Sequence, residues 1–207
     1  MTRLSNPFGD KPQCTREKIL RATYETLTES GYGDTSISRI ADRAGISKSV
    51  VYHHFDDKES LLLEVLDTVL DRLIEETFGQ PEWGPRKELE HFLTHFIPEQ
   101  RLDNDPAARS RARLGKTYVY LRVQAISMPL YREKFVRSEA KVKDRLTETI
   151  RAGIEQGEFR PTDPEQASEY IMTFVAGVIF REMTTESVSS KLLQREAQEI
   201  LTDLLYQ

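Results

Sequence analysis

The sequence predicts an all-α protein in which a small head of three helices precedes a larger helical body. Apolar residues recur at helical spacing along most of the 207 residues. No stretch bounded by turn residues alternates apolar and polar side chains for long enough to indicate a β-strand. The longest apolar run is residues 174–180, FVAGVIF. It is far shorter than the ~20 residues of a membrane-spanning helix, which excludes an integral membrane protein.

Turn and capping residues place the elements of the head. Residues 1–14, which are rich in proline and poor in apolar side chains, predict a flexible arm. Thr15 can then cap a first helix that Gly31 ends. A short second helix follows, capped by Thr35 or Ser36 and ended by Gly45. Ser47 precedes a third helix over residues 48–54. A long fourth helix, capped by an aspartate, spans about residues 57–78.

The body begins after a turn at residues 79–85 and contains five further helical segments. Asp163 is well placed to cap one of them because Pro164 follows at the first helical position. The five segments are predicted over residues 86–100, 106–127, 129–157, 165–184 and 190–206.

Charge and cysteine content narrow the class of protein. The net charge is -5, yet residues 1–60 hold equal numbers of basic and acidic residues, so the acidic excess lies entirely in the body. This asymmetry is expected if the head meets an anionic partner. Cys14 is the single cysteine, which excludes an intramolecular disulfide and a cysteine-based zinc site. Since residues 1–14 also lack the apolar run of a signal peptide, we expect a reducing, cytoplasmic setting.

Residues 36–54, SISRIADRAGISKSVVYHH, have the order and spacing of a helix-turn-helix. Ala41 is small where two helices must approach, and Gly45 can adopt the positive φ of the turn. The outward face of the second helix carries hydrogen-bond donors that suit the major groove of DNA, namely Lys48, Ser49, Tyr52 and His53. Helical hairpins with a glycine turn also occur as plain structure, so this geometry alone leaves both interpretations open.

A longer motif string is more specific. Residues 16–61 contain Gly31-Tyr32-x-x-Thr35-Ser36-Ile37, Ile40-Ala41-x-x-Ala44-Gly45-Ile46-Ser47 and Val51-Tyr52-x-His54-Phe55-x-x-Lys58-Glu59-x-Leu61. This string resembles the DNA-binding head of the TetR (tetracycline repressor) family of transcription regulators. The rest of the chain is similar to that family in the order of its helices, and residues 153–167 show a weaker sequence similarity to it.

The resemblance implies a role for each motif residue. Tyr52 and Lys58 would hold DNA phosphates, and Thr35 or Ser36 would offer a hydroxyl and helix N-terminal amides to another. Lys48, Ser49 and His53 would lie nearest the bases. Phe55 is expected to pin the third helix to the fourth. Arg16 and Lys18 are either contacts to DNA or ordinary solvated charges.

The resemblance also implies a homodimer formed by the last two helices and a body pocket for a small effector. Aromatic residues gather in the body, where most are expected in the core and a subset lining a cavity would favour an apolar or amphipathic effector. Two inward-pointing residues of the basic stretch Arg109, Arg111, Arg113, Lys116 and Arg122 could anchor a carboxylate or phosphate, such as the head of a fatty acid or acyl-CoA. A solvated helix face is the alternative interpretation of that stretch. The candidate effector-binding residues are Phe92, Phe96, Arg113, Tyr118, Phe135 and Phe174.

Other chemistry finds little support in the sequence. His91 and His95, at i and i+4, could share a metal ion, but no third ligand is evident, so we expect no metal and no cofactor. Enzyme signatures are lacking. The sequence thus predicts a DNA-binding domain at residues 15–60 and an effector-binding and dimerisation domain at 61–207. Together these two domains predict a repressor that binds a pseudo-palindromic operator and is released from it by an effector. A helical carrier or enzyme that has lost DNA binding, and a regulator without a ligand, are the rival hypotheses.

Overall fold

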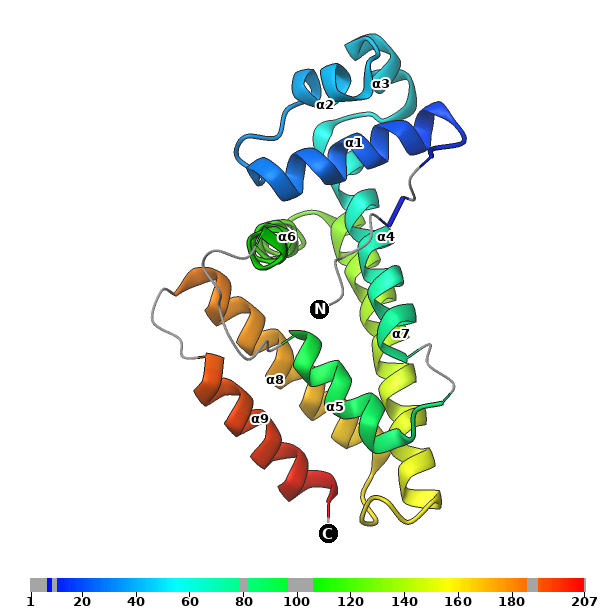
Figure 1. The fold of residues 1–207 in the computed structure, drawn as a ribbon, viewed down its shortest axis with the longest axis vertical. Helices are drawn as coiled ribbons and strands as arrows, with labels where there is room; N and C mark the ends of the chain where they lie inside the picture. Colours follow the sequence, from blue (N-terminus) through cyan, green and yellow to red (C-terminus); the bar gives the residue numbers. More distant parts are fainter. Residues whose placement is uncertain (1–6, 9–10, 79–81, 97–105, 186–189, 207) are drawn as a thin grey trace. The chain divides into compact units, whose positions relative to one another are not determined.

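The computed structural model describes residues 7–8, 11–78, 82–96, 106–185 and 190–206. These residues form nine α-helices and no strand (Figure 1), so the predicted all-α class is confirmed. No helix in these ranges is both long and apolar enough to cross a membrane. The helices are α1 (Thr15–Ser30), α2 (Ile37–Ala44), α3 (Lys48–His54), α4 (Lys58–Phe78), α5 (Pro85–Phe96), α6 (Pro106–Gln124), α7 (Pro129–Glu155), α8 (Pro164–Thr184) and α9 (Ser190–Leu205).

The chain packs into two compact units. The first comprises α1, α2, α3, most of α4, α6 and the start of α7, within Met1–Arg72 and Leu102–Lys134. The second comprises the end of α4, α5, most of α7, α8 and α9, within Leu73–Arg101 and Phe135–Gln207.

Side-chain caps explain where several helices begin. The Asp57 carboxylate accepts from the Ser60 amide at 2.7 Å before α4, and Asp163 accepts from the Glu165 amide at 2.9 Å before α8. The expected cap of α1 is wrong: Thr15 is already helical, and the Cys14 thiol accepts from the Glu17 amide at 3.5 Å.

The corner between α6 and α7 corrects one predicted helix end. The helix expected to reach residue 127 stops at Gln124, because the chain turns over the next residues. The Arg132 guanidinium donates to the carbonyls of Ala125, at 3.1 Å, and Ile126, at 2.8 Å. These bonds satisfy carbonyls at the end of α6 that would otherwise lack a partner.

In the first unit, α1 lies between α2 and α3 on one side and α6 on the other (Figure 1). The core side chains of the first unit are largely inaccessible to solvent. Arg16 forms a bidentate ion pair with Glu64 of α4, and its guanidinium lies 4.9 Å from the centroid of the Phe55 ring. The fully buried apolar residues of this core are Ile19, Leu27, Ile40, Val51, Leu61, Leu62, Val65 and Leu121.

The second unit has a continuous apolar core between α5, α7, α8 and α9. Phe159, in the turn between α7 and α8, is 1% exposed and lies directly against Gly153. The core includes Phe78, Leu89, Phe92, Leu146, Ile150, Ile171, Val175 and Leu201.

Candidate nucleic-acid interface

The helix-turn-helix forms as the sequence predicts. Gly45 has φ 61° and ψ 43°, the left-handed conformation that glycine adopts without steric cost. The Ile46 amide donates to the Ala41 carbonyl at 3.0 Å, which closes the turn. Val51 is fully buried and fixes the rotation of α3 about its axis. The opposite face of α3 is consequently turned to solvent.

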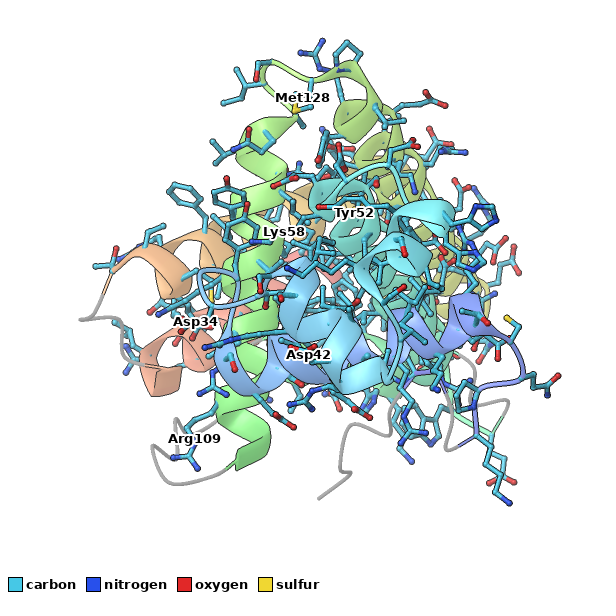
Figure 2. All side chains as sticks on the ribbon, turned by 90° about the horizontal axis from the view of Figure 1, so that it is seen from above. Asp34, Asp42, Tyr52, Lys58, Arg109 and Met128 are labelled. Carbon is cyan, nitrogen blue, oxygen red and sulfur yellow. The ribbon has the colours of Figure 1, made fainter. Side chains whose placement is uncertain are left out.

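That solvent face carries the predicted DNA-contacting side chains of α3. Lys48, Ser49 and His53 are exposed, and Tyr52 is 55% exposed. Figure 2, which looks onto this end of the first unit, shows Tyr52 on α3. His54 is partly buried, with its ring 5.4 Å from that of His53. The geometry therefore favours His53 over His54 as the residue available to a ligand.

Only one of the two candidate hydroxyls before α2 is accessible. Thr35 is 2% exposed and donates its hydroxyl to the Gly31 carbonyl at 2.7 Å. Ser36 is exposed and caps α2 by accepting from the Arg39 amide at 3.3 Å. Since Thr35 is committed to the protein interior, Ser36 is the residue of this pair that can offer its side chain to a phosphate.

Lys58, at the start of α4, is held by an aromatic residue. Its Nζ lies 4.0 Å from the centroid of the Tyr32 ring and donates to the Tyr32 carbonyl at 3.2 Å. Burial lowers the pKa of Lys58 below that of a free lysine. The Tyr32 ring packs in turn on Tyr120 of α6, with centroids 4.0 Å apart.

Three of the four arginines in residues 15–60 pair with acids of the first unit. Arg43 binds Glu29, and this hydrogen bond lowers the pKa of Glu29. Arg21 pairs with Glu25 at 2.8 Å. Arg16 pairs with Glu64, as described above, so its charge is already compensated within the protein. In the described part of the head, Lys48 and Lys18 are exposed and have no ion pair.

The predicted effector-binding residues fall into two groups. Phe92 belongs to the core of the second unit, and Phe96 and Phe174 are partly buried against it, with the ring centroids of Phe92 and Phe96 4.9 Å apart. Phe135 is also buried in that unit.

The other two candidates belong to the first unit. Arg113 donates from Nη1 to the Thr28 carbonyl at 2.6 Å and so caps the last turn of α1. Tyr118 accepts from Arg122 at 3.4 Å. Sequence reasoning missed two contacts of α6 with the head, Arg113 with Thr28 of α1 and Tyr120 with Tyr32 after α1, because the residues of each pair lie more than 80 positions apart.

The described residues contain no group of three or more histidine, cysteine, aspartate or glutamate side chains that could hold a metal ion. The His91 ring packs against Trp83 with centroids 4.6 Å apart, and burial lowers the pKa of His91. The side chain of His95 lies outside the described residues.

Comparison with known proteins now identifies the class. Residues 19–65 match the family model described as bacterial regulatory proteins, tetR family. Residues 116–204 match the model described as AefR-like transcriptional repressor, C-terminal domain. The chain belongs to the TetR family of helix-turn-helix transcriptional regulators.

Two curated relatives illustrate how the likeness is distributed. The transcriptional repressor AcnR of Corynebacterium glutamicum is 24% identical over 193 residues, covering 91% of this chain and 94% of that protein. The transcriptional regulator BetI of Stenotrophomonas maltophilia is 40% identical over 60 residues, which are 29% of this chain and 31% of BetI.

Solved structures share the fold over nearly the whole chain. A TetR transcription regulator from Haloarcula marismortui has a TM-score of 0.76 and 26% identity, covering 92% of this chain and 98% of that one. A regulator from Saccharomonospora viridis in complex with choline has a TM-score of 0.75 and 18% identity, covering 93% and 97%. FadR from Bacillus subtilis in complex with stearoyl-CoA has a TM-score of 0.65 and 22% identity, covering 89% and 96%.

Proposed function

We propose that this protein is a cytoplasmic repressor whose homodimer binds a pseudo-palindromic operator and is released by an amphipathic effector. Each copy places α3 in the major groove of one half-site, and two-fold symmetry sets the half-sites about one helical turn of DNA apart or slightly more. Residues 15–60 provide the DNA contacts, and residues 61–207 provide effector binding and dimerisation. Ligand-responsive repression is typical of this family.

The observation that carries the proposal is the solvent face of α3. Lys48, Ser49 and His53 offer hydrogen-bond donors suited to base edges, while Tyr52 offers a hydroxyl to a backbone phosphate. Ser36 and Lys58 supply further phosphate contacts beside them. The opposite face of α3 is fixed in the core through Val51, so these donors are displayed by a rigid element.

The test is fluorescence anisotropy with the DNA upstream of the protein's own gene, measured across a salt series. We expect specific binding that weakens as salt rises, because lysines that bind phosphates release counterions. Lys48→Ala and Tyr52→Ala should each weaken binding by about ten-fold or more, as expected when an interaction of ~1–3 kcal/mol is removed.

Lys87→Ala is the matched control, since it removes one exposed lysine from α5 in the second unit. It should bind like the wild type. Equal, weak binding of every variant to any DNA sequence would contradict the repressor and favour the rival hypothesis of a carrier that has lost DNA binding.

The aromatic residues of the second unit support an effector with a large apolar part. Phe92 and Phe135 are buried, and Phe96 and Phe174 pack against the same unit's core, an environment that suits an acyl chain. FadR, which shares the fold, binds stearoyl-CoA, and the Saccharomonospora viridis regulator binds choline.

The effector is tested by titrating the protein–DNA complex with stearate, stearoyl-CoA and choline separately. Release by an acyl probe but not by choline is the expected result. A ligand shifts an equilibrium only by its differential affinity for the two states, so unchanged DNA affinity with all three probes would contradict release by this class of effector.

A further inference from the structure

Three side chains from distant parts of the chain meet beside the first turn of α4. Lys58 lies over the ring of Tyr32, and Tyr32 packs on Tyr120 of α6 at an interplanar angle of 33°. The Tyr32 hydroxyl donates to the Glu59 carboxylate at 3.3 Å. The Tyr32 side chain is therefore fixed by Glu59 of α4 through its hydroxyl, and by Tyr120 of α6 through ring packing and a side-chain hydrogen bond.

Tyr32 restrains the Lys58 ammonium in two ways. The ring attracts the cation, and the Tyr32 carbonyl accepts one of its hydrogens. An ammonium has three N–H donors, so the site is not saturated. Burial lowers the pKa of Lys58, as expected for a cation that is partly desolvated and whose charge is incompletely compensated. A phosphate that reached this position would complete the compensation.

The position of Tyr120 is itself fixed by the packing of α6 on α1. Arg113, two turns earlier in α6, donates to the Thr28 carbonyl, and Leu121 beside Tyr120 is fully buried. Tyr120 is 40% exposed, so its ring is a surface support for Tyr32 and does not belong to the core. Its removal should leave the fold intact.

We propose that Tyr120 is a positioning residue for DNA binding: its ring holds Tyr32, which holds the Lys58 ammonium ready for a phosphate. This role rests on the proposed function, because it requires Lys58 to bind DNA. Without Tyr120, the Tyr32 ring loses its support and the long Lys58 side chain regains freedom that phosphate binding must then remove.

The test is a double-mutant cycle on the duplex that the wild-type protein selects from a random-sequence library. Lys58→Met should weaken binding about ten-fold and reduce the slope of log affinity against log salt by about 0.9 for each phosphate that the protein no longer neutralises. Tyr120→Leu should weaken binding about three- to ten-fold in the wild-type background and have no effect in the Lys58→Met background. Tyr120→Phe keeps the ring but loses the hydroxyl that hydrogen-bonds Tyr32, so its affinity should lie closer to that of the wild type than the affinity of Tyr120→Leu does.

A readout without DNA separates this role from the proposed function. In the free protein, NMR signals of the Lys58 side chain should be displaced upfield by the Tyr32 ring. In Tyr120→Leu they should move toward those of a solvated lysine, and the pKa of Lys58 should rise toward its ordinary value. Val123→Ala, which truncates another exposed side chain of α6, should change neither signal nor affinity.

Three results would overturn the positioning role while the proposed function stands. In the first, Tyr120→Leu binds DNA as tightly as the wild type. In the second, Tyr120→Leu weakens binding equally in the wild-type and Lys58→Met backgrounds. In the third, Lys58→Met has the affinity and the salt slope of the wild type. Failure of the wild type to select any sequence would overturn the proposed function and, with it, the role of Tyr120.

Discussion

Gly153 is a residue whose lack of a side chain is required by a neighbour. The Phe159 ring occupies the space beside its Cα, so a Cβ at position 153 would overlap the ring, with Cγ at 2.8 Å. Phe159 is nearly inaccessible and lies within the core of the second unit, where it packs 5.7 Å from the Tyr206 ring. The ring therefore cannot move aside without disturbing several helices.

We expect Gly153→Ala to lower the free energy of unfolding by about 1–3 kcal/mol through overpacking, although alanine favours helix more than glycine does. Urea denaturation measures this difference. Gly33→Ala is the control, because a Cβ at Gly33 meets nothing within 4 Å. Combining Gly153→Ala with Phe159→Leu should recover part of the loss, and a Gly153→Ala protein as stable as the wild type would contradict the explanation.

At the scale of elements, α8 has a face with two exposed aromatic side chains. Tyr170 and Phe180 are 53% and 52% exposed, and the exposed residues Thr173 and Gly177 lie between them on the same side. Small residues between two aromatic side chains let another helix approach closely. This pattern supports α8 as part of the isologous interface that the family's homodimers require.

Phe180→Glu should convert the proposed homodimer into monomers, because a carboxylate would be desolvated at the interface without a partner. Sedimentation equilibrium over a range of concentrations measures the shift. Val136→Glu is the matched control, since it places the same charge at an exposed apolar position of α7 in the same unit. Unchanged self-association of Phe180→Glu would place the interface elsewhere.

Local chemistry made the elements predictable, whereas pairings distant in sequence escaped prediction. Asp163 with Pro164, and Gly45 with its left-handed conformation, set helix boundaries through neighbouring atoms, so the sequence reveals them. Cys14 replaced Thr15 as the cap of α1 because a thiol can accept an amide hydrogen, although weakly. Tyr120 gave no signal in the sequence, because its role depends on how α6 packs against the head.

The molecule as a whole should lose stability in alkali. Burial raises the pKa of Tyr131, in the first unit, to about 12 from the ordinary 10.0. Between these pH values the unfolded chain carries tyrosinate while the folded chain keeps the proton. The folded state then binds more protons, so the free energy of unfolding falls as pH rises.

Replacing the titrating hydroxyl tests this dependence. We expect Tyr131→Phe to flatten the decline in unfolding free energy between pH 10 and 12 by about 1.4 kcal/mol per pH unit. Burial likewise raises the pKa of Tyr206, in the second unit, to about 12, so Tyr206→Phe should flatten it further. Chemical denaturation at several pH values measures the slopes, and a Tyr131→Phe slope equal to that of the wild type would contradict the prediction.

The two compact units interleave along the chain, and this constrains the order in which they can fold during synthesis. The helices of the head leave the ribosome first, yet α6, which covers α1, follows only after α5 of the second unit has been made. The Thr28 carbonyl accepts from Arg113, which lies 85 residues later in the chain and is therefore synthesised much later. Until then the face of α1 that α6 covers is bare, so this face should be open to chaperones and proteases in a nascent chain stalled near residue 72 and protected in one stalled beyond α7.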